Sequence, residues 1–159
     1  MAILYEKLLK ETPIAVVESE ELPEKIKGLY VETPSNKVIL LNKNISESAE
    51  KACVLAEELG HYYMTTGNIL DQSKIENRRQ EKRARSWAYE KLVPLSKIVQ
   101  AYLAGVENCH QLAQYLEVTD SFLIDAIKRY QEKYGLKAKH GPYIIYFNPL
   151  QVRKEDFCG

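Results

Sequence analysis

Three ionisable residues stand close together in the stretch Glu57-Glu58-Leu59-Gly60-His61. In an α-helix, residues four positions apart lie on one face, so Glu57 and His61 are placed to bind the same metal ion. Glu58 is one position further on, where a carboxylate can take the proton of a water molecule beside that ion. This stretch therefore predicts a divalent metal site, with zinc as the expected ion and Glu58 as the catalytic base.

Two protein ligands are too few for a catalytic zinc ion, which usually has three of them and a water molecule. A second helix, predicted over residues 77–91, carries Glu81 on the face that it shares with Ala84 and Trp87. A polar link over residues 68–77 would let the two helices run antiparallel and bring Glu81 opposite His61. We therefore predict that Glu57, His61 and Glu81 are the metal ligands.

The helix that carries the first two ligands is predicted to begin near Ser46, a suitable N-cap, and to end near Gly67. Mostly small residues recur along it at helical spacing, namely Ala49, Ala52, Cys53, Ala56, Gly60 and Tyr63. Small side chains on one helix face indicate that another element packs closely against it. Tyr63 is assigned to this packing face.

The remaining elements are predicted from periodicity and turn residues. A helix over residues 1–11 and a strand over 14–17 come first, and the Thr33-Pro34-Ser35-Asn36 turn then joins two strands in a hairpin. Helices are predicted over residues 96–104, 108–117 and 121–134, with a strand over 143–147 and a polar tail over the last ten residues. The prediction is a mainly helical α+β fold with a small three-stranded sheet.

Two stretches resemble a known family. Glu57-Glu58-x-x-His61 has the layout of the His-Glu-x-x-His metalloprotease helix, with Glu57 in place of the first histidine. Residues 55–62 and 81–94 resemble the signatures of the ImmA/IrrE family, Ala-His-Glu-Leu/Ile-Gly-His and Glu-x-x-Ala-x-x-Phe-Ala-x-x-Leu-Leu-x-Pro. With the hairpin and the later helices, the resemblance covers roughly residues 1–135.

The resemblance implies a zincin-like minimal peptidase of the gluzincin type, found in bacteria, phages and mobile elements. Members are often encoded beside a helix-turn-helix repressor, which some of them cleave, so the implied substrate is a partner protein of that kind. His61 matches the second histidine ligand, Glu58 the catalytic glutamate and Glu81 the third ligand. The implied peptidase domain spans residues 1–105, and residues 106–159 form a helix-turn-helix-like extension that ends in a strand.

Glu57 departs from the family pattern. A carboxylate binds zinc, but a second one in the site adds negative charge and weakens the pull of the metal on its water molecule. It also shifts the preference of the site toward harder divalent ions. The alternative is therefore a catalytically weak or inactive family member that regulates by binding a protein or DNA.

Three further features have both a functional and a structural interpretation. Tyr62 is a candidate donor to a developing oxyanion. Lys128 and Arg129, on the second helix of the helix-turn-helix-like segment, are candidate nucleic-acid contacts, although Asp120 and Asp125 in that helix favour a scaffold or docking role. His110 is expected at the surface, near the start of its helix.

Composition limits the class of protein. The chain has 159 residues and a formal net charge of zero, which predicts one domain with a small extension and gives no argument for a nucleic-acid or membrane partner. Its three cysteines are not spaced as metal ligands and fit reduced thiols. The sequence shows neither a signal peptide nor an apolar run of membrane length, so a cytoplasmic protein is expected.

Overall fold

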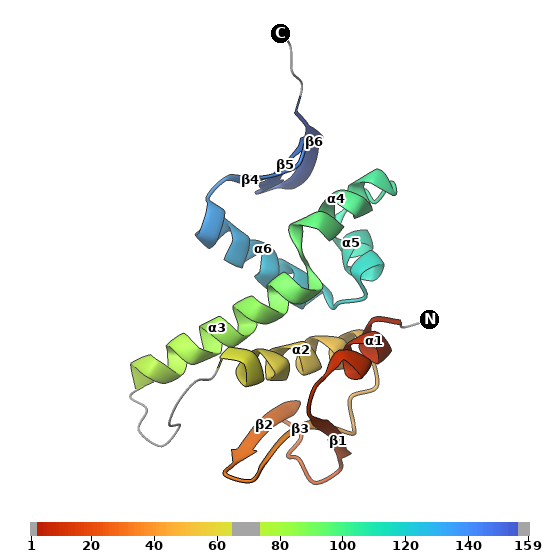
Figure 1. The fold of residues 1–159 in the computed structure, drawn as a ribbon. Coiled ribbons are helices and arrows are strands. Elements are labelled where there is room, and N and C mark those ends of the chain that lie inside the picture. The colour runs from red at the N-terminus through yellow and green to blue at the C-terminus, as the bar shows by residue number, and fades with distance from the viewer. Residues whose placement is uncertain (1–2, 65–73, 156–159) are drawn as a thin grey trace. The chain divides into compact units, whose positions relative to one another are not determined.

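The computed structural model of the protein describes residues 3–64 and 74–155. The first half contains α1 (Ile3–Glu11), β1 (Ala15–Ser19), β2 (Gly28–Thr33), β3 (Asn36–Asn42), α2 (Ser48–Met64) and α3 (Lys74–Leu92). The second contains α4 (Leu95–Leu103), α5 (Cys109–Leu116), α6 (Asp120–Tyr134), β4 (Lys137–His140), β5 (Tyr143–Phe147) and β6 (Leu150–Lys154) (Figure 1). The predicted α+β fold, mainly helical, is confirmed.

The described chain divides into two compact units, Met1–Ala88 and Tyr89–Gly159. The boundary lies inside α3, so this helix contributes residues to both units. The division predicted from the sequence, between residues 105 and 106, is a different one and remains a prediction about domain organisation.

In the first unit, β1, β2 and β3 form a three-stranded sheet in the order β1-β3-β2. β3 pairs in parallel with β1 and antiparallel with β2, across the tight turn that Pro34 and Ser35 form. Ile39 and Leu41 are fully buried on the face of the sheet that packs against α2. This arrangement matches the predicted hairpin and places the edge strand β2 beside the predicted site helix.

α2 packs closely against α3 because Gly60 lies at their contact. A Cβ atom at Gly60 would come within 2.9 Å of the Ala84 Cα and still closer to the Ala84 carbonyl oxygen. Both residues are buried, and Ala52 and Ala56 continue the small-residue face of α2. The close packing predicted from this stripe is confirmed for Ala52, Ala56 and Gly60, whereas Tyr63, which was assigned to the same face, is exposed.

In the second unit, α5 and α6 form the predicted helix-turn-helix-like pair. Glu117 turns the chain with a left-handed backbone (φ 60°), and the Thr119 hydroxyl accepts a hydrogen bond from the Phe122 N–H at 3.2 Å to cap α6. Tyr130, on α6, donates a buried hydrogen bond of 2.7 Å to the Val93 carbonyl. This bond ties the middle of α6 to the segment that follows α3.

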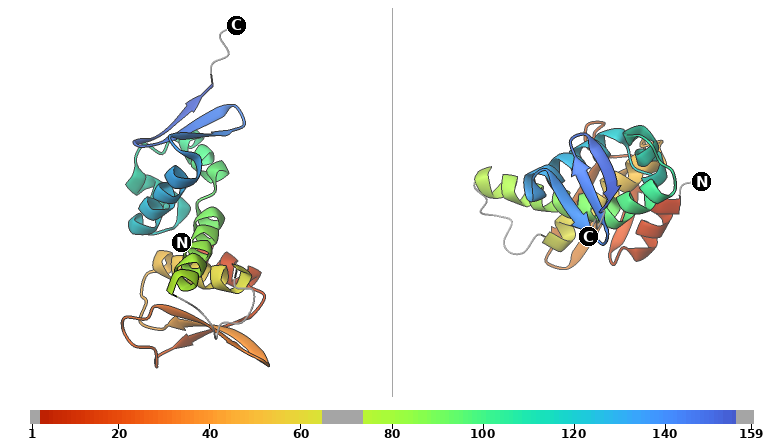
Figure 2. Two further views of the ribbon diagram at one scale, coloured as in Figure 1. Left: turned by 90° about the vertical axis from the view of Figure 1, so that its left-hand side faces the viewer. Right: turned by 90° about the horizontal axis from the view of Figure 1, so that it is seen from above.

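A second three-stranded sheet, in the order β4-β5-β6, covers helices of the second unit (Figure 2). Only β5 was predicted. The polar tail predicted over the last ten residues is wrong for β6, which pairs antiparallel with β5, and β4 pairs with the other side of β5. Both strands are short and carry basic residues, and they owe their structure to pairing with the apolar β5.

No helix in the part of the chain that the structure describes has the length and apolar character needed to cross a membrane.

Candidate active site

α2 places the predicted site residues on the side of the helix that its buried stripe leaves open. Leu55, Ala56, Leu59 and Gly60 are buried, whereas Glu57, Glu58 and His61 are half-buried beside them. A helix turns by 100° per residue, so Glu57, Glu58 and His61 all fall outside this stripe, on the remaining side of α2, where they reach both the protein and solvent.

His61 and Glu81 converge from the two helices. The His61 Nε2 lies 3.2 Å from the Glu81 Oε1, and the Glu81 Oε2 lies 4.0 Å from the Arg85 Nε on the next turn of α3. The two helices approach each other closely at Gly60 and Ala84. Gly60 is next to His61 and Ala84 is one turn from Glu81, so the two side chains can reach each other. The structure therefore brings together these two predicted ligands.

Glu58 points to the other neighbour of α2, the strand β2. A Cβ atom at Gly28 would lie 3.1 Å from the Glu58 Cγ, and the Glu58 carboxylate accepts a hydrogen bond from the Tyr30 backbone. Burial, followed by the charges of Glu57 and Glu81, raises the pKa of Glu58 to about 7, and the bond from Tyr30 opposes the rise. In the metal-free chain, Glu58 is therefore present in both its protonated and its ionised form near neutral pH.

The open edge of β2 lies beside this carboxyl group. The Asn42 N–H, at the end of β3, donates to the carbonyl of Lys27 at 2.8 Å, so the residue pair directly before Gly28 of β2 is hydrogen-bonded. Bonded and non-bonded pairs alternate along an antiparallel ladder, so the backbone groups of Gly28, Tyr30 and Glu32 point away from β3. The Tyr30 N–H is the one that reaches Glu58.

Tyr62 belongs to a row of aromatic rings. Its ring centroid lies 6.1 Å from that of Tyr30 and 4.9 Å from that of Tyr63, which stacks on Trp87 at 4.9 Å. The Lys37 ammonium lies 5.5 Å from the Tyr62 centroid. These contacts give Tyr62 a packing role. Its role as an oxyanion donor stays a prediction.

The spacing of the His61 and Glu81 side-chain atoms fits two ligands of one divalent ion, but no third ligand among the residues described is in place beside them. Two ligands on one tetrahedral zinc ion stand about 3.4 Å apart when each is about 2.0–2.1 Å from the metal. The distance of 3.2 Å between the His61 and Glu81 atoms is close to that spacing. Within the described residues, however, no group of three or more His, Cys, Asp or Glu side chains is gathered closely enough to hold a metal. Glu57 thus remains a predicted third ligand, one helical turn before His61.

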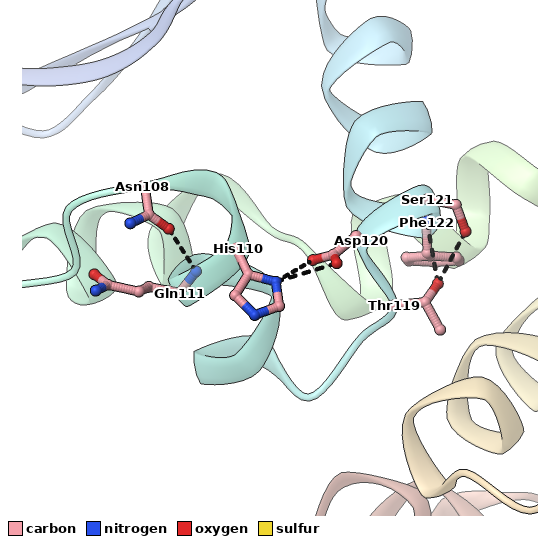
Figure 3. A network of polar contacts seen from close by, with 7 residues as sticks. All are labelled: Asn108, His110, Gln111, Thr119, Asp120, Ser121 and Phe122. Carbon is pink, nitrogen blue, oxygen red and sulfur yellow. Dashed lines mark hydrogen bonds and ion pairs between the residues drawn. The ribbon is translucent and has the colours of Figure 1, made fainter.

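The residues predicted as nucleic-acid contacts lie on α6. Lys128 is exposed, whereas the Arg129 guanidinium lies 3.6 Å from the Glu132 carboxylate one turn later, which reduces the charge available to a phosphate. The N-terminal end of α6 presents Asp120, whose carboxylate oxygens both lie 3.1 Å from the Nδ1 of His110 (Figure 3). This pair joins the start of α5 to the start of α6 at the surface.

Sequence reasoning missed the contribution of β2. Gly28 lets the strand approach Glu58, and the Tyr30 backbone holds the carboxylate, yet both lie about thirty residues before the motif. A glycine at the start of a strand was the one available signal, since it often marks a close approach of another group.

Comparison with known proteins supports the peptidase interpretation. Residues 9–128 match the family model described as the IrrE N-terminal-like domain, which is classed among the peptidases. No curated protein and no solved structure matches the chain. The matched range includes β1 to β3, α2 and α3, and therefore every residue of the candidate active site. The chain belongs to the peptidase family of the IrrE N-terminal-like domain.

Proposed function

We propose that the protein is a metal-dependent endopeptidase that cleaves a partner protein. The observation that carries the proposal is the contact between His61 of α2 and Glu81 of α3, whose side-chain atoms lie 3.2 Å apart. The same helix α2 also places Glu58 against the open edge of β2. A pair of metal donors, an adjacent carboxyl group and a free strand edge are the parts that hydrolysis of an extended peptide requires.

In this proposal, His61, Glu81 and Glu57 would hold a divalent ion, zinc in the first instance. A bound divalent ion supplies Lewis-acid polarisation of a carbonyl group and lowers the pKa of water. Glu58 takes a proton from the attacking water molecule and delivers it to the leaving amine. Tyr62 is the proposed hydrogen-bond donor to the oxyanion.

The substrate segment binds along β2 in extended form. The backbone groups of Gly28 and Glu32 point to the open edge of the sheet and are placed to pair with a peptide on either side of Tyr30. A co-encoded repressor of the helix-turn-helix type is the proposed partner, because the family resemblance implies such substrates. The peptide would need a locally unfolded stretch to add to this edge.

The second candidate function is regulation by binding, without efficient proteolysis. It is favoured by Glu57, whose carboxylate adds negative charge where a neutral imidazole would bind, and by the absence of a preformed group of three ligands within the described residues. In this case the protein would control its partner by contact, or bind DNA through Lys128 and Arg129.

Incubation with a purified helix-turn-helix repressor, the proposed class of partner, distinguishes the two functions. The enzyme proposal expects zinc-dependent cleavage that is lost in Glu58→Gln and His61→Ala, whereas the matched variant of an exposed glutamate, Glu24→Gln, remains active. Binding of the repressor without cleavage by the wild-type protein, together with an unchanged phenotype of Glu58→Gln, would support the regulator. A salt-dependent DNA shift that disappears on neutralising Lys128 and Arg129 would support the DNA-binding form.

A further inference from the structure

A groove lies within the second unit, beside the open edge of β6. It has a volume of about 440 Å³ and is lined by Ile98, Ala101 and Tyr102 of α4, Cys109 and Leu112 of α5, and residues 150–153 of β6, among others. Binding pockets commonly have volumes of about 300–1,000 Å³. The groove shares no residue with the candidate active site, and all of its lining residues belong to one compact unit.

On the strand side of the groove, β6 presents backbone groups that do not pair with β5. The Glu155 N–H donates to the Pro142 carbonyl at 2.7 Å, so this residue pair is hydrogen-bonded between β6 and β5. Because bonded pairs alternate along the ladder, Arg153 and Gln151 also point their backbone groups toward β5. The N–H and carbonyl of Val152 must then point to the open edge of the sheet.

The helix side of the groove is apolar. Ile98, Ala101 and Leu112 are buried there, and the Val152 side chain is buried as well. An apolar wall next to backbone donors and acceptors that do not pair with β5 suits a segment that offers a backbone for pairing and apolar side chains for the wall.

The polar side chains at the rim are already engaged. The Asn108 side chain caps α5 by accepting a hydrogen bond from the Gln111 N–H at 2.9 Å, and the Gln111 side chain accepts from the Glu107 N–H at 2.9 Å. The Arg153 guanidinium lies 5.7 Å from the centroid of the Tyr146 ring. A small polar ligand would therefore find few side chains to bind, whereas the Val152 backbone groups suit a peptide.

We propose that this groove is a docking site for an extended, apolar segment of a partner protein, which pairs with β6 as a further strand. Its backbone would bond to Val152, and its apolar side chains would contact Ile98 and Leu112. The Glu107 carboxylate at the mouth favours a lysine or arginine in the segment. Docking here requires no metal and is therefore independent of the proposed catalysis.

The test uses a displayed library of random linear peptides, selected on the full-length protein in the presence of EDTA. Peptides selected on the wild-type protein are expected to bind at least about tenfold more weakly to Val152→Pro, which lacks the outward N–H but keeps the pairing of β6 with β5. They are also expected to protect the Val152 amide from hydrogen exchange.

A second way to block the groove acts from the helix side and leaves β6 unchanged. In a Cys158→Ser background, a bulky maleimide on the exposed Cys109 would fill the groove, whereas Cys53 is buried. The matched control carries the same maleimide on Gln114→Cys, an exposed position of α5 outside the groove, with Cys109→Ser and Cys158→Ser. Peptide binding should be lost with the label on Cys109 and kept in the control.

Three results would overturn the proposal. The first is a selection that yields no specific peptide, and the second is a set of peptides whose binding is the same after both blocks. The third is a dimer of the free protein that dissociates when Cys109 is labelled, because the groove would then hold a second copy of the chain. None of these readouts depends on cleavage, so failure of the peptidase proposal leaves the result of this test unchanged.

Discussion

Replacement of Gly60 by alanine tests how the active site is assembled. The added methyl group would lie 2.9 Å from the Ala84 Cα and closer still to its carbonyl oxygen, whereas ordinary contacts begin near 3.4 Å. The obstacle is the backbone of α3, which cannot rotate away as a side chain can. Because the carbonyl oxygen is the closest atom, we therefore expect α2 and α3 to move apart by roughly 1 Å at this point, which reduces dispersion contacts along the interface.

Two effects of opposite sign determine the magnitude. Alanine favours a helix interior over glycine by about 1 kcal/mol, whereas overpacking a well-packed contact typically costs about 1–3 kcal/mol and occasionally more. Because the clash is with a backbone, the upper part of that range applies, and we expect a net loss of about 1–2 kcal/mol. For a chain of this length, that loss lowers the Tm by roughly 2–8 °C.

The assay combines urea unfolding, followed by circular dichroism, with zinc titration. Gly60→Ala should lower the free energy of unfolding and also weaken zinc binding, because His61 and Glu81 move apart. The control is Ala56→Gly, one turn earlier on α2, which should cost about 2 kcal/mol in helix propensity and lost methyl burial but leave the two helices in contact. A Gly60→Ala protein that is more stable than wild type and binds zinc equally well would refute the close approach of α2 and α3.

Three further predictions concern single residues. In metal-free protein, the folded-state pKa of Glu58 of about 7 exceeds the ordinary glutamate value of 4.5, so the native state holds the proton more tightly and loses stability as pH rises from 4.5 through 7. Glu58→Gln should remove this pH-dependent loss of stability: relative to wild type, its free energy of unfolding should be higher by at most about 3 kcal/mol at pH 8 and little changed at pH 4. Wild type and Glu58→Gln whose stabilities depend on pH in the same way would contradict the prediction. Tyr130→Phe should cost about 1–2 kcal/mol in chemical unfolding, because the Val93 carbonyl loses its buried donor at 2.7 Å, and an unchanged midpoint would argue against that bond. Asn42→Ala should lower the free energy of unfolding by about 2–3 kcal/mol and increase hydrogen exchange in residues 20–27, because the buried Asn42 amide donates to the Pro23 and Ile26 carbonyls at 3.2 and 3.0 Å. Increased exchange confined to other segments would contradict this role.

Local patterns in the sequence were sufficient to predict the elements that hold the site. Helical periodicity located α2 and α3, and the small residues Ala52, Ala56 and Gly60 correctly indicated a close packing partner. The turn at Pro34 and Ser35 predicted the hairpin. These signals are local because propensity, turn chemistry and the spacing of apolar residues act over a few positions.

The features that the sequence did not predict depend on distant contacts. β4 and β6 are short, charged strands that are stable because each pairs with β5, and no local pattern distinguishes them from a polar tail. The contact of Glu58 with Gly28 and Tyr30 is similar, because it joins a helix to a strand far away in the sequence. The separation of the ligands could be derived only after the packing of α2 on α3 was known.

The most direct test of the metal site is the zinc content of purified full-length protein, measured by mass spectrometry after dialysis against zinc and removal of the excess. The wild-type protein and Glu58→Gln should each retain one ion per chain, because Glu58 is not a ligand. His61→Ala and Glu81→Gln should each lose it. Zinc absent from the wild-type protein, or retained equally by all four proteins, would contradict a site built from His61 and Glu81.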